Sequence, residues 1–177
     1  KSVRKSVLVP YSPTEMFELV SAVPAYPQFL PWCDFARVLQ TLPDGKVAEV
    51  GIGLGGLRQS FVTRNTERFG QQIDLHLVRG PFSDLHGRWC FELLEDGNTR
   101  ACRVQLDLNY RFSSFLLSRL VGPVFDRVAV TLVDAFTQRA HQVMEEKSDS
   151  LCVTLVYVVQ AGDLLEKNLC LPKGSTV

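Results

Sequence analysis

The side chains that could carry out catalysis form no recognisable set in this sequence. His76 and His86 fall on strand positions that alternation points outward, and His141 lies near the end of a helical segment. No serine has the G-x-S-x-G setting of an activated nucleophile. A cyclase-like enzyme would need an acid or base inside a cavity. Because Tyr110 alone offers such a group on an inward position, we expect no enzyme activity and no catalytic residue.

The cysteines are odd in number and widely scattered. No pair has C-x-x-C or metal-ligand spacing. We therefore expect reduced thiols that behave as small buried hydrophobic groups, with neither a metal site nor a cofactor. The five are Cys33, Cys90, Cys102, Cys152 and Cys170.

The glycines between Gly51 and Gly56 superficially match a dinucleotide-binding loop. Such a loop must open a helix whose N-terminus receives the phosphates. Here the segment precedes another predicted strand. We interpret it as the end of a hairpin whose glycines bend the sheet or gate a cavity.

Composition indicates one ordinary domain with a short extension. The chain has 177 residues, 46% of them hydrophobic, and its 19 basic side chains balance 19 acidic ones. No bulk charge therefore favours nucleic acid or an anionic membrane. No apolar run reaches the roughly 20 residues of a membrane span, and the first ten residues lack the apolar core of a signal peptide. We expect a cytoplasmic protein, with a location peripheral to the inner membrane as an additional option.

A hydrophobic period of two predicts seven strands. Short turn-like links join the last six, which forces antiparallel hairpins. Between the first strand and the others, Ser12, Pro13 and Glu15 predict a capped helix, and the prolines around Tyr26 predict a second short helix or turn. The predicted strands are Ser2–Val9, Asp34–Leu42, Lys46–Leu54, Leu57–Glu67, Gln71–Val78, Asp84–Glu95 and Thr99–Arg111.

A long helix follows, from Ser113 to Glu146. Apolar residues recur there at steps of three and four, and Ser113 or Ser114 can cap its start. Gly122-Pro123 should interrupt it, leaving a short helix or kinked turn up to about Val121 and a straight helix from Pro123. The predicted fold class is α+β: a strongly curved seven-stranded antiparallel sheet wrapped around this C-terminal helix, with a cavity between them.

Strand alternation predicts which side chains face that cavity. Almost every ionisable group falls on the opposite face, and Phe61 shares its face with the neutral polar residues Thr63 and Asn65. Such a cavity suits an apolar ligand with a carbonyl-bearing head. The alternative is a core in which these residues only pack together. Expected wall residues are Phe61, Leu75, Leu77, Trp89, Phe91, Leu106, Leu108, Leu120, Val124, Phe125, Val128 and Leu132, with Phe29, Pro31 and Trp32 at the mouth and Thr63, Asn65 and Tyr110 as head-group partners.

Several stretches, in order and spanning roughly residues 1 to 146, carry a resemblance to a known family. The chain resembles the START-like coenzyme-Q-binding family, whose bacterial branch is also called ribosome-association toxin A. The matching stretches are Lys5 to Pro13, Val23 to Cys33, Gly80 to Phe82, Leu85 to Phe91, Val121 to Phe125 and Leu132 to Phe136.

The resemblance implies a helix-grip (START/Bet v 1-like) fold that holds ubiquinone, another polyprenyl quinone or a different lipid, and that supports respiration without catalysis. In the bacterial branch it also implies binding to the large ribosomal subunit, which blocks subunit joining. Older labels for such sequences, oligoketide cyclase and lipid transport protein, borrow from fold relatives. We therefore keep a ribosome-association toxin as the first alternative and a polyketide cyclase-like enzyme as the second. A local basic patch would contact RNA or phospholipid, and the alternative is a solvated face with interleaved carboxylates. The patch consists of four arginines on the outer strand faces, Arg64, Arg88, Arg103 and Arg111, together with Arg79.

The last 30 residues depart from the family. We divide the chain into a START-like domain, 1–147, and a tail, 148–177. In the tail, Leu151 to Val159 and Leu164 to Leu171 look like two strands, similar to the first hairpin of a ubiquitin-like protein. Such a hairpin cannot bury a core of its own. We expect it to pair with a sheet edge, either in this chain or in a second copy as a dimer.

Overall fold

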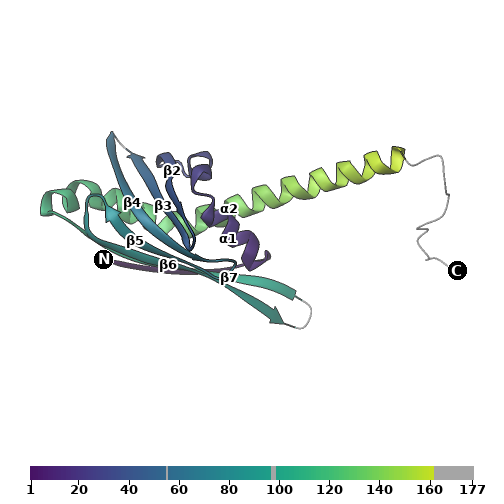
Figure 1. Cartoon of the computed structure of the whole chain (residues 1–177), viewed down its shortest axis with the longest axis horizontal. Coiled ribbons are helices and arrows are strands. Elements are labelled where there is room, and N and C mark those ends of the chain that lie inside the picture. The colour runs from purple at the N-terminus through teal and green to yellow at the C-terminus, as the bar shows by residue number, and fades with distance from the viewer. Residues whose placement is uncertain (55, 97–98, 162–177) are drawn as a thin grey trace. The chain divides into compact units, whose positions relative to one another are not determined.

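The computed structural model describes residues 1–54, 56–96 and 99–161. Within them, seven strands form one antiparallel sheet with the spatial order β1-β7-β6-β5-β4-β3-β2 (Figure 1). The α+β class and the helix-grip arrangement are confirmed. The elements are β1 (Ser2–Val9), α1 (Pro13–Ser21), the 3-10 helix η1 (Val23–Gln28), β2 (Cys33–Leu42), β3 (Gly45–Leu54), β4 (Leu57–Arg68), β5 (Gln72–Arg79), β6 (Phe82–Asp96), β7 (Thr99–Phe112) and α2 (Phe115–Ala161).

Local sequence explains how the first helix begins. The backbone N–H of Glu15 donates to the Ser12 hydroxyl at 3.2 Å, and the Ser12 N–H donates to the Glu15 carboxylate at 2.8 Å. This reciprocal pair satisfies two donors that a helix N-terminus leaves free. Pro13 stands at the first helical position, where a missing N–H costs nothing. The predicted capping box is confirmed.

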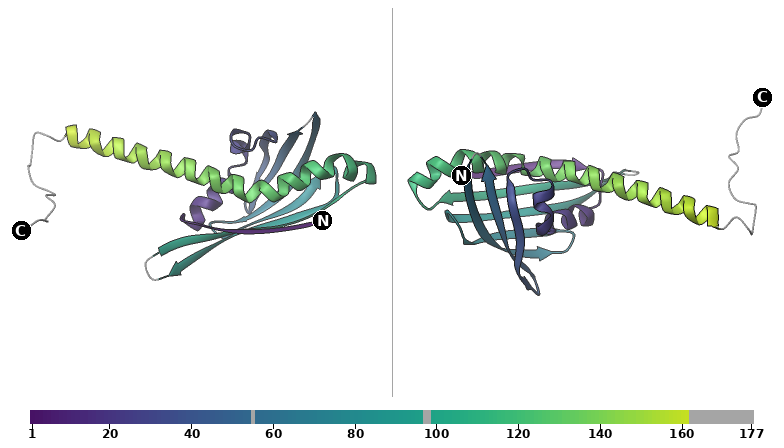
Figure 2. Two further views of the ribbon diagram at one scale, coloured as in Figure 1. Left: turned by 180° about the vertical axis from the view of Figure 1, so that it is seen from behind. Right: turned by 90° about the horizontal axis from the view of Figure 1, so that it is seen from above.

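The strand alternation on β6 is also confirmed. Leu85 and Trp89 are buried, whereas Asp84, His86 and Arg88 between and beside them are exposed. Figure 2 shows the sheet curving around α2, which lies across its concave face. The apolar side chains of β3 to β7 therefore meet the buried side of α2 and form the core.

α2 differs from the prediction at Gly122-Pro123. Ser114 caps the helix, accepting a hydrogen bond from the Leu117 N–H at 3.2 Å. From Phe115 the helix then continues through Pro123 without a separate first segment. Pro123 is exposed, as is Arg119 one turn earlier. Water can therefore hydrate the Arg119 carbonyl, which loses its helical partner at this proline, and the expected interruption does not occur.

The chain divides after Ala140 into two units. In the second, the strand predicted over Leu151–Val159 is wrong, because α2 runs to Ala161. Leu151, Leu155 and Val159 recur at four-residue steps, which fits a helix. A helix satisfies its backbone groups locally, whereas a lone strand needs a neighbour. The second predicted strand, Leu164 to Leu171, lies outside the described residues. The domain boundary at residue 147 falls within α2 and stays a prediction.

Candidate ligand-binding cavity

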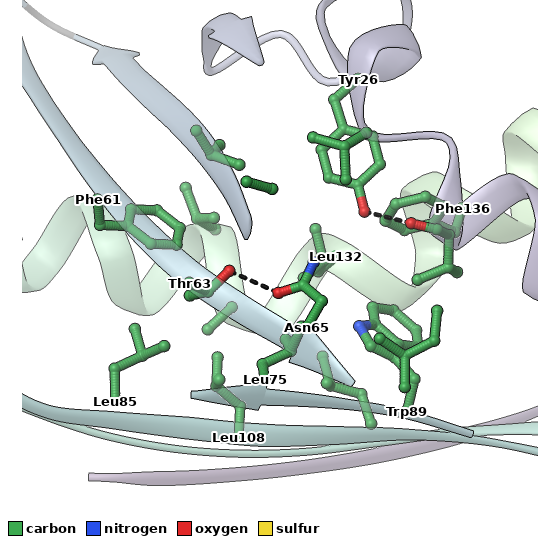
Figure 3. A pocket seen from close by; sticks show the side chains of 18 of the residues that line it. Tyr26, Phe61, Thr63, Asn65, Leu75, Leu85, Trp89, Leu108, Leu132 and Phe136 are labelled. Carbon is green, nitrogen blue, oxygen red and sulfur yellow. Dashed lines mark hydrogen bonds between the residues drawn. The ribbon is translucent and has the colours of Figure 1, made fainter. Parts of the chain in front are cut away.

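A cavity of about 80 Å³ lies between the concave face of the sheet, α1, η1 and α2. Figure 3 shows its side chains converging from these elements. Eleven of the seventeen residues predicted to bind a ligand line it. These are Trp32, Phe61, Thr63, Asn65, Leu75, Trp89, Leu106, Leu108, Phe125, Val128 and Leu132.

Three predicted wall residues lie elsewhere on α2 and on the sheet. Leu120 is 59% exposed, on the face of α2 that points away from the sheet. Val124 and Leu77 are half-buried and pack against the core outside the cavity lining. Both sides of α2 are apolar here, so periodicity alone could not decide which side turns inward.

Three predicted aromatic residues also lie outside the lining. The Phe91 ring contacts the Phe17 ring of α1 at 5.8 Å. The Phe29 ring packs on Phe136, 5.1 Å between centroids, so it supports the wall from behind. The Tyr110 hydroxyl donates to the Asp126 carboxylate. Tyr110 is therefore tied to α2, and its predicted role as a head-group partner finds no support in this geometry.

Sequence reasoning missed nine residues that complete the wall. Two of them, Ile73 and Leu85, stand on the strand faces that alternation had marked as inward, and Phe136 continues the four-residue step of Val128 and Leu132. These signals could have found them. Ala48 and Val50 stand on β3, and Ala129 follows Val128 on α2. The remaining three, Val20, Val23 and Tyr26, depend on how α1 and η1 dock. The nine are Val20, Val23, Tyr26, Ala48, Val50, Ile73, Leu85, Ala129 and Phe136.

Two neutral polar side chains from β4 stand in this apolar wall. The Thr63 hydroxyl donates to the Asn65 side-chain oxygen at 2.7 Å, and both residues are buried. Figure 3 shows the amide nitrogen of Asn65 turned toward the cavity. Among the described residues, no acceptor is hydrogen-bonded to that nitrogen. Thr63 therefore fixes the orientation of the amide and leaves its N–H groups available to a ligand.

The cavity carries no ionisable carboxyl, amine, guanidine or imidazole among its described lining residues. Its one titratable group is Tyr26, whose hydroxyl donates to the Val20 carbonyl at 2.5 Å. Burial raises the pKa of Tyr26 well above its usual value, and nearby Cys33 and Glu67 raise it further. The tyrosine therefore stays neutral at physiological pH. Glu49 is also buried, but it pairs with Arg37 at 2.6 Å on the other face of β3.

The arginines of the outer sheet face are mostly paired with carboxylates. Arg88 contacts Asp74 at 2.6 Å, and Arg103 contacts Glu92 at 2.9 Å. Arg64 binds both oxygens of Asp44. A phosphate group would have to compete with these carboxylates, so this face offers less free positive charge than the sequence indicates.

In the part of the chain that the structure describes, no group of acidic, histidine and cysteine side chains could hold a metal ion. Cys33, Cys90 and Cys102 are free thiols. Burial raises the pKa of Cys33 and Cys102 to about 11, so both remain protonated. None of the described helices combines the length and apolarity that a membrane span requires.

Known proteins resemble this chain in sequence and in fold. A ribosome association toxin of Pseudomonas aeruginosa is 41% identical over 140 residues, 79% of this chain and 95% of that protein. A mitochondrial coenzyme Q-binding protein, homolog B, of Xenopus laevis is 27% identical over 78% of this chain and 57% of its own length. An aromatase/cyclase from Streptomyces sp. R1128 shares the fold, with a TM-score of 0.64 at 15% identity over 80% of this chain and 94% of that one.

These relatives match the START-like family that the sequence resembles. The family model for polyketide cyclase/dehydrase and lipid transport matches residues 9–137, which include strands β2 to β7 and every residue that lines the cavity. The chain therefore belongs to the polyketide cyclase/dehydrase and lipid transport family.

Proposed function

We propose that the chain binds ubiquinone, an apolar ligand with a carbonyl-bearing head, in the cavity between the sheet and α2. The protein binds this ligand without catalysing a reaction. The observation that carries the proposal is the pairing of an uncharged, largely aromatic and aliphatic wall with the free amide nitrogen of Asn65. An apolar cavity with few, well-placed polar groups is typical of small-molecule sites. The proposed location is the cytoplasm.

Asn65 supplies the specificity in this proposal. A quinone carbonyl that enters the cavity leaves water and must regain a hydrogen bond, because an unpaired buried carbonyl is costly. The amide N–H of Asn65 offers that bond, and Thr63 holds the amide in place from the other side. No described lining residue is a carboxylic acid or a histidine. Proton transfer at the ligand therefore lacks a nearby acid or base, which supports binding without chemistry.

Tryptophan fluorescence tests the proposal directly. The chain has two tryptophans, Trp32 and Trp89, and both line the cavity. Adding a short-chain ubiquinone should quench their emission in a saturable way. Asn65→Leu, which keeps the size of the side chain and removes its donor, should weaken binding about tenfold, the value of one hydrogen bond.

The matched control is Asn109→Leu, on an outward position of β7, which should leave the affinity unchanged. A branched hydrocarbon without a carbonyl should bind the original protein and Asn65→Leu equally. Absence of saturable quenching in the original protein would refute quinone binding at this site.

Ribosome association is the second candidate, and the 41% identity to a protein named for it is the specific observation that favours it. On this proposal the outer sheet face contacts the large ribosomal subunit through Arg88 and Arg103. The double variant Arg88→Glu/Arg103→Glu should then abolish co-sedimentation with the large subunit. It replaces two cations by anions beside Asp74 and Glu92, so this face would become negative and repel the phosphates of ribosomal RNA. Quinone quenching should not change, because both arginines lie outside the cavity. Undiminished co-sedimentation would exclude this face.

A further inference from the structure

The solvent-facing side of α2 is unusually apolar near its start. Phe115 is 81% exposed, Leu116 64% and Leu120 59%. Val130, three turns further along, is 52% exposed. Large apolar side chains normally turn inward on a helix that packs on a sheet. Here α2 has an apolar buried side and a second apolar stripe that its own fold leaves uncovered.

The two charges on this stripe that lack a partner are both positive, whereas Asp126 and Asp134 on the same side of α2 are paired with Lys1 and Lys5. Arg119 and Arg127 are exposed, and neither forms an ion pair with any residue in the described parts of the chain. Asp126 is the acidic residue nearest to them on α2, and it is engaged by Lys1 and by the Tyr110 hydroxyl. The stripe therefore presents apolar groups and free guanidinium groups together. On the outer sheet face, by contrast, Arg64, Arg88 and Arg103 are paired with carboxylates.

We propose that the stripe formed by Phe115, Leu116, Arg119, Leu120 and Arg127 docks on an anionic lipid bilayer. A helix face that combines large apolar side chains with cations suits the boundary between headgroups and acyl chains. Each cation near an anionic leaflet adds attraction. A nucleic acid would use the two arginines, but it would leave the exposed phenylalanine and leucines without an apolar environment. The composition of the stripe therefore favours lipid over RNA.

The stripe and the cavity lie on opposite sides of one helix. Phe125, Val128 and Leu132 line the cavity, whereas Leu116 and Leu120 point away from it. Docking would place α2, which lines the cavity, at the surface of the membrane. A polyprenyl ligand is dissolved in the interior of that membrane. The proposed quinone binding gives this docking its purpose. The docking itself rests only on the exposed side chains.

Sedimentation with vesicles tests the docking. Vesicles of 70% phosphatidylcholine and 30% phosphatidylglycerol should retain the protein, and pure phosphatidylcholine vesicles should retain it much less. Arg119→Gln/Arg127→Gln should lower the partition coefficient on anionic vesicles roughly 20-fold, about fivefold for each charge. Leu116→Ser/Leu120→Ser should lower it at least tenfold, since both leucines would no longer enter the interface.

Leu8→Ser/Leu39→Ser is the matched control, because those leucines are exposed at 61% and 43% on the two edge strands. It should bind vesicles as the original protein does. Quinone quenching without vesicles should be unchanged in every variant, so a failure of docking can be told from a failure of the cavity proposal. Wild-type levels of vesicle binding in Leu116→Ser/Leu120→Ser would overturn the proposal. The proposal would also be overturned if the protein bound ribosomal RNA through Arg119 and Arg127 but did not bind anionic vesicles.

Discussion

Replacement of Phe136 by alanine should lower the free energy of unfolding by about 3–5 kcal/mol, the range for removing a fully buried aromatic side chain. Phe136 is 1% exposed. Its ring lies 5.4 Å from Trp89 of β6, 5.3 Å from Tyr26 of η1 and 5.1 Å from Phe29. One side chain of α2 therefore joins the helix to the sheet and to η1, and its loss would open a void on all three sides.

Urea unfolding followed by far-ultraviolet circular dichroism measures this loss. Phe115→Ala is the matched control, since it deletes the same ring from the same helix at an 81% exposed position. It should change stability by less than about 0.5 kcal/mol. Similar losses in the two variants would show that the packing of α2 on the sheet is not as described.

Gly45→Ala should be nearly as damaging, at about 3 kcal/mol or more. Gly45 has φ of +148°, a conformation that side-chain-bearing residues rarely adopt, and an added Cβ would lie 2.0 Å from the Asn65 carbonyl oxygen. Backbone strain and the clash contribute separately. Because β4 must move to relieve the clash, the Asn65 side chain in the cavity should shift as well, and the affinity for quinone should fall with stability.

Gly56→Ala provides the comparison for this variant. Gly56 also has a positive φ, +81°, but an added Cβ would meet no atom within 4 Å. Its cost should be limited to backbone strain, about 1 kcal/mol, and quinone affinity should be unchanged. Equal losses at the two glycines, measured by urea unfolding, would contradict the role of the contact between β3 and β4.

The sheet could be predicted from the sequence because its signals are local. A period of two along β6, with Leu85 and Trp89 inward and His86 outward, fixes both the strand and its face. Short links then leave antiparallel pairing as the available choice. The same logic placed Thr63 and Asn65 on the concave side, and the structure puts them in the cavity wall.

α2 was harder to predict because its pattern is ambiguous. Near its start apolar residues stand on both sides, and the sequence predicts a cavity position for Leu120, which in the structure faces solvent. The choice depends on the position of the sheet, which no local window contains. For Leu151–Val159, β-branched composition favoured a strand, whereas the helix forms because each backbone group finds a partner within the segment. Tyr26 reaches the cavity wall only because η1 docks beside the sheet, and hydrophobic periodicity cannot predict how η1 docks.

The small size of the cavity has a kinetic consequence. An apolar cavity of about 150 Å³ accepts a benzene ring, and the free space here is about 80 Å³. A substituted quinone can therefore enter only when the wall side chains move apart. Opening of the wall, rather than diffusional encounter with the ligand, therefore limits the rate of ligand binding. The observed association rate should level off at high ligand concentration, and that plateau reports how often the wall opens by itself.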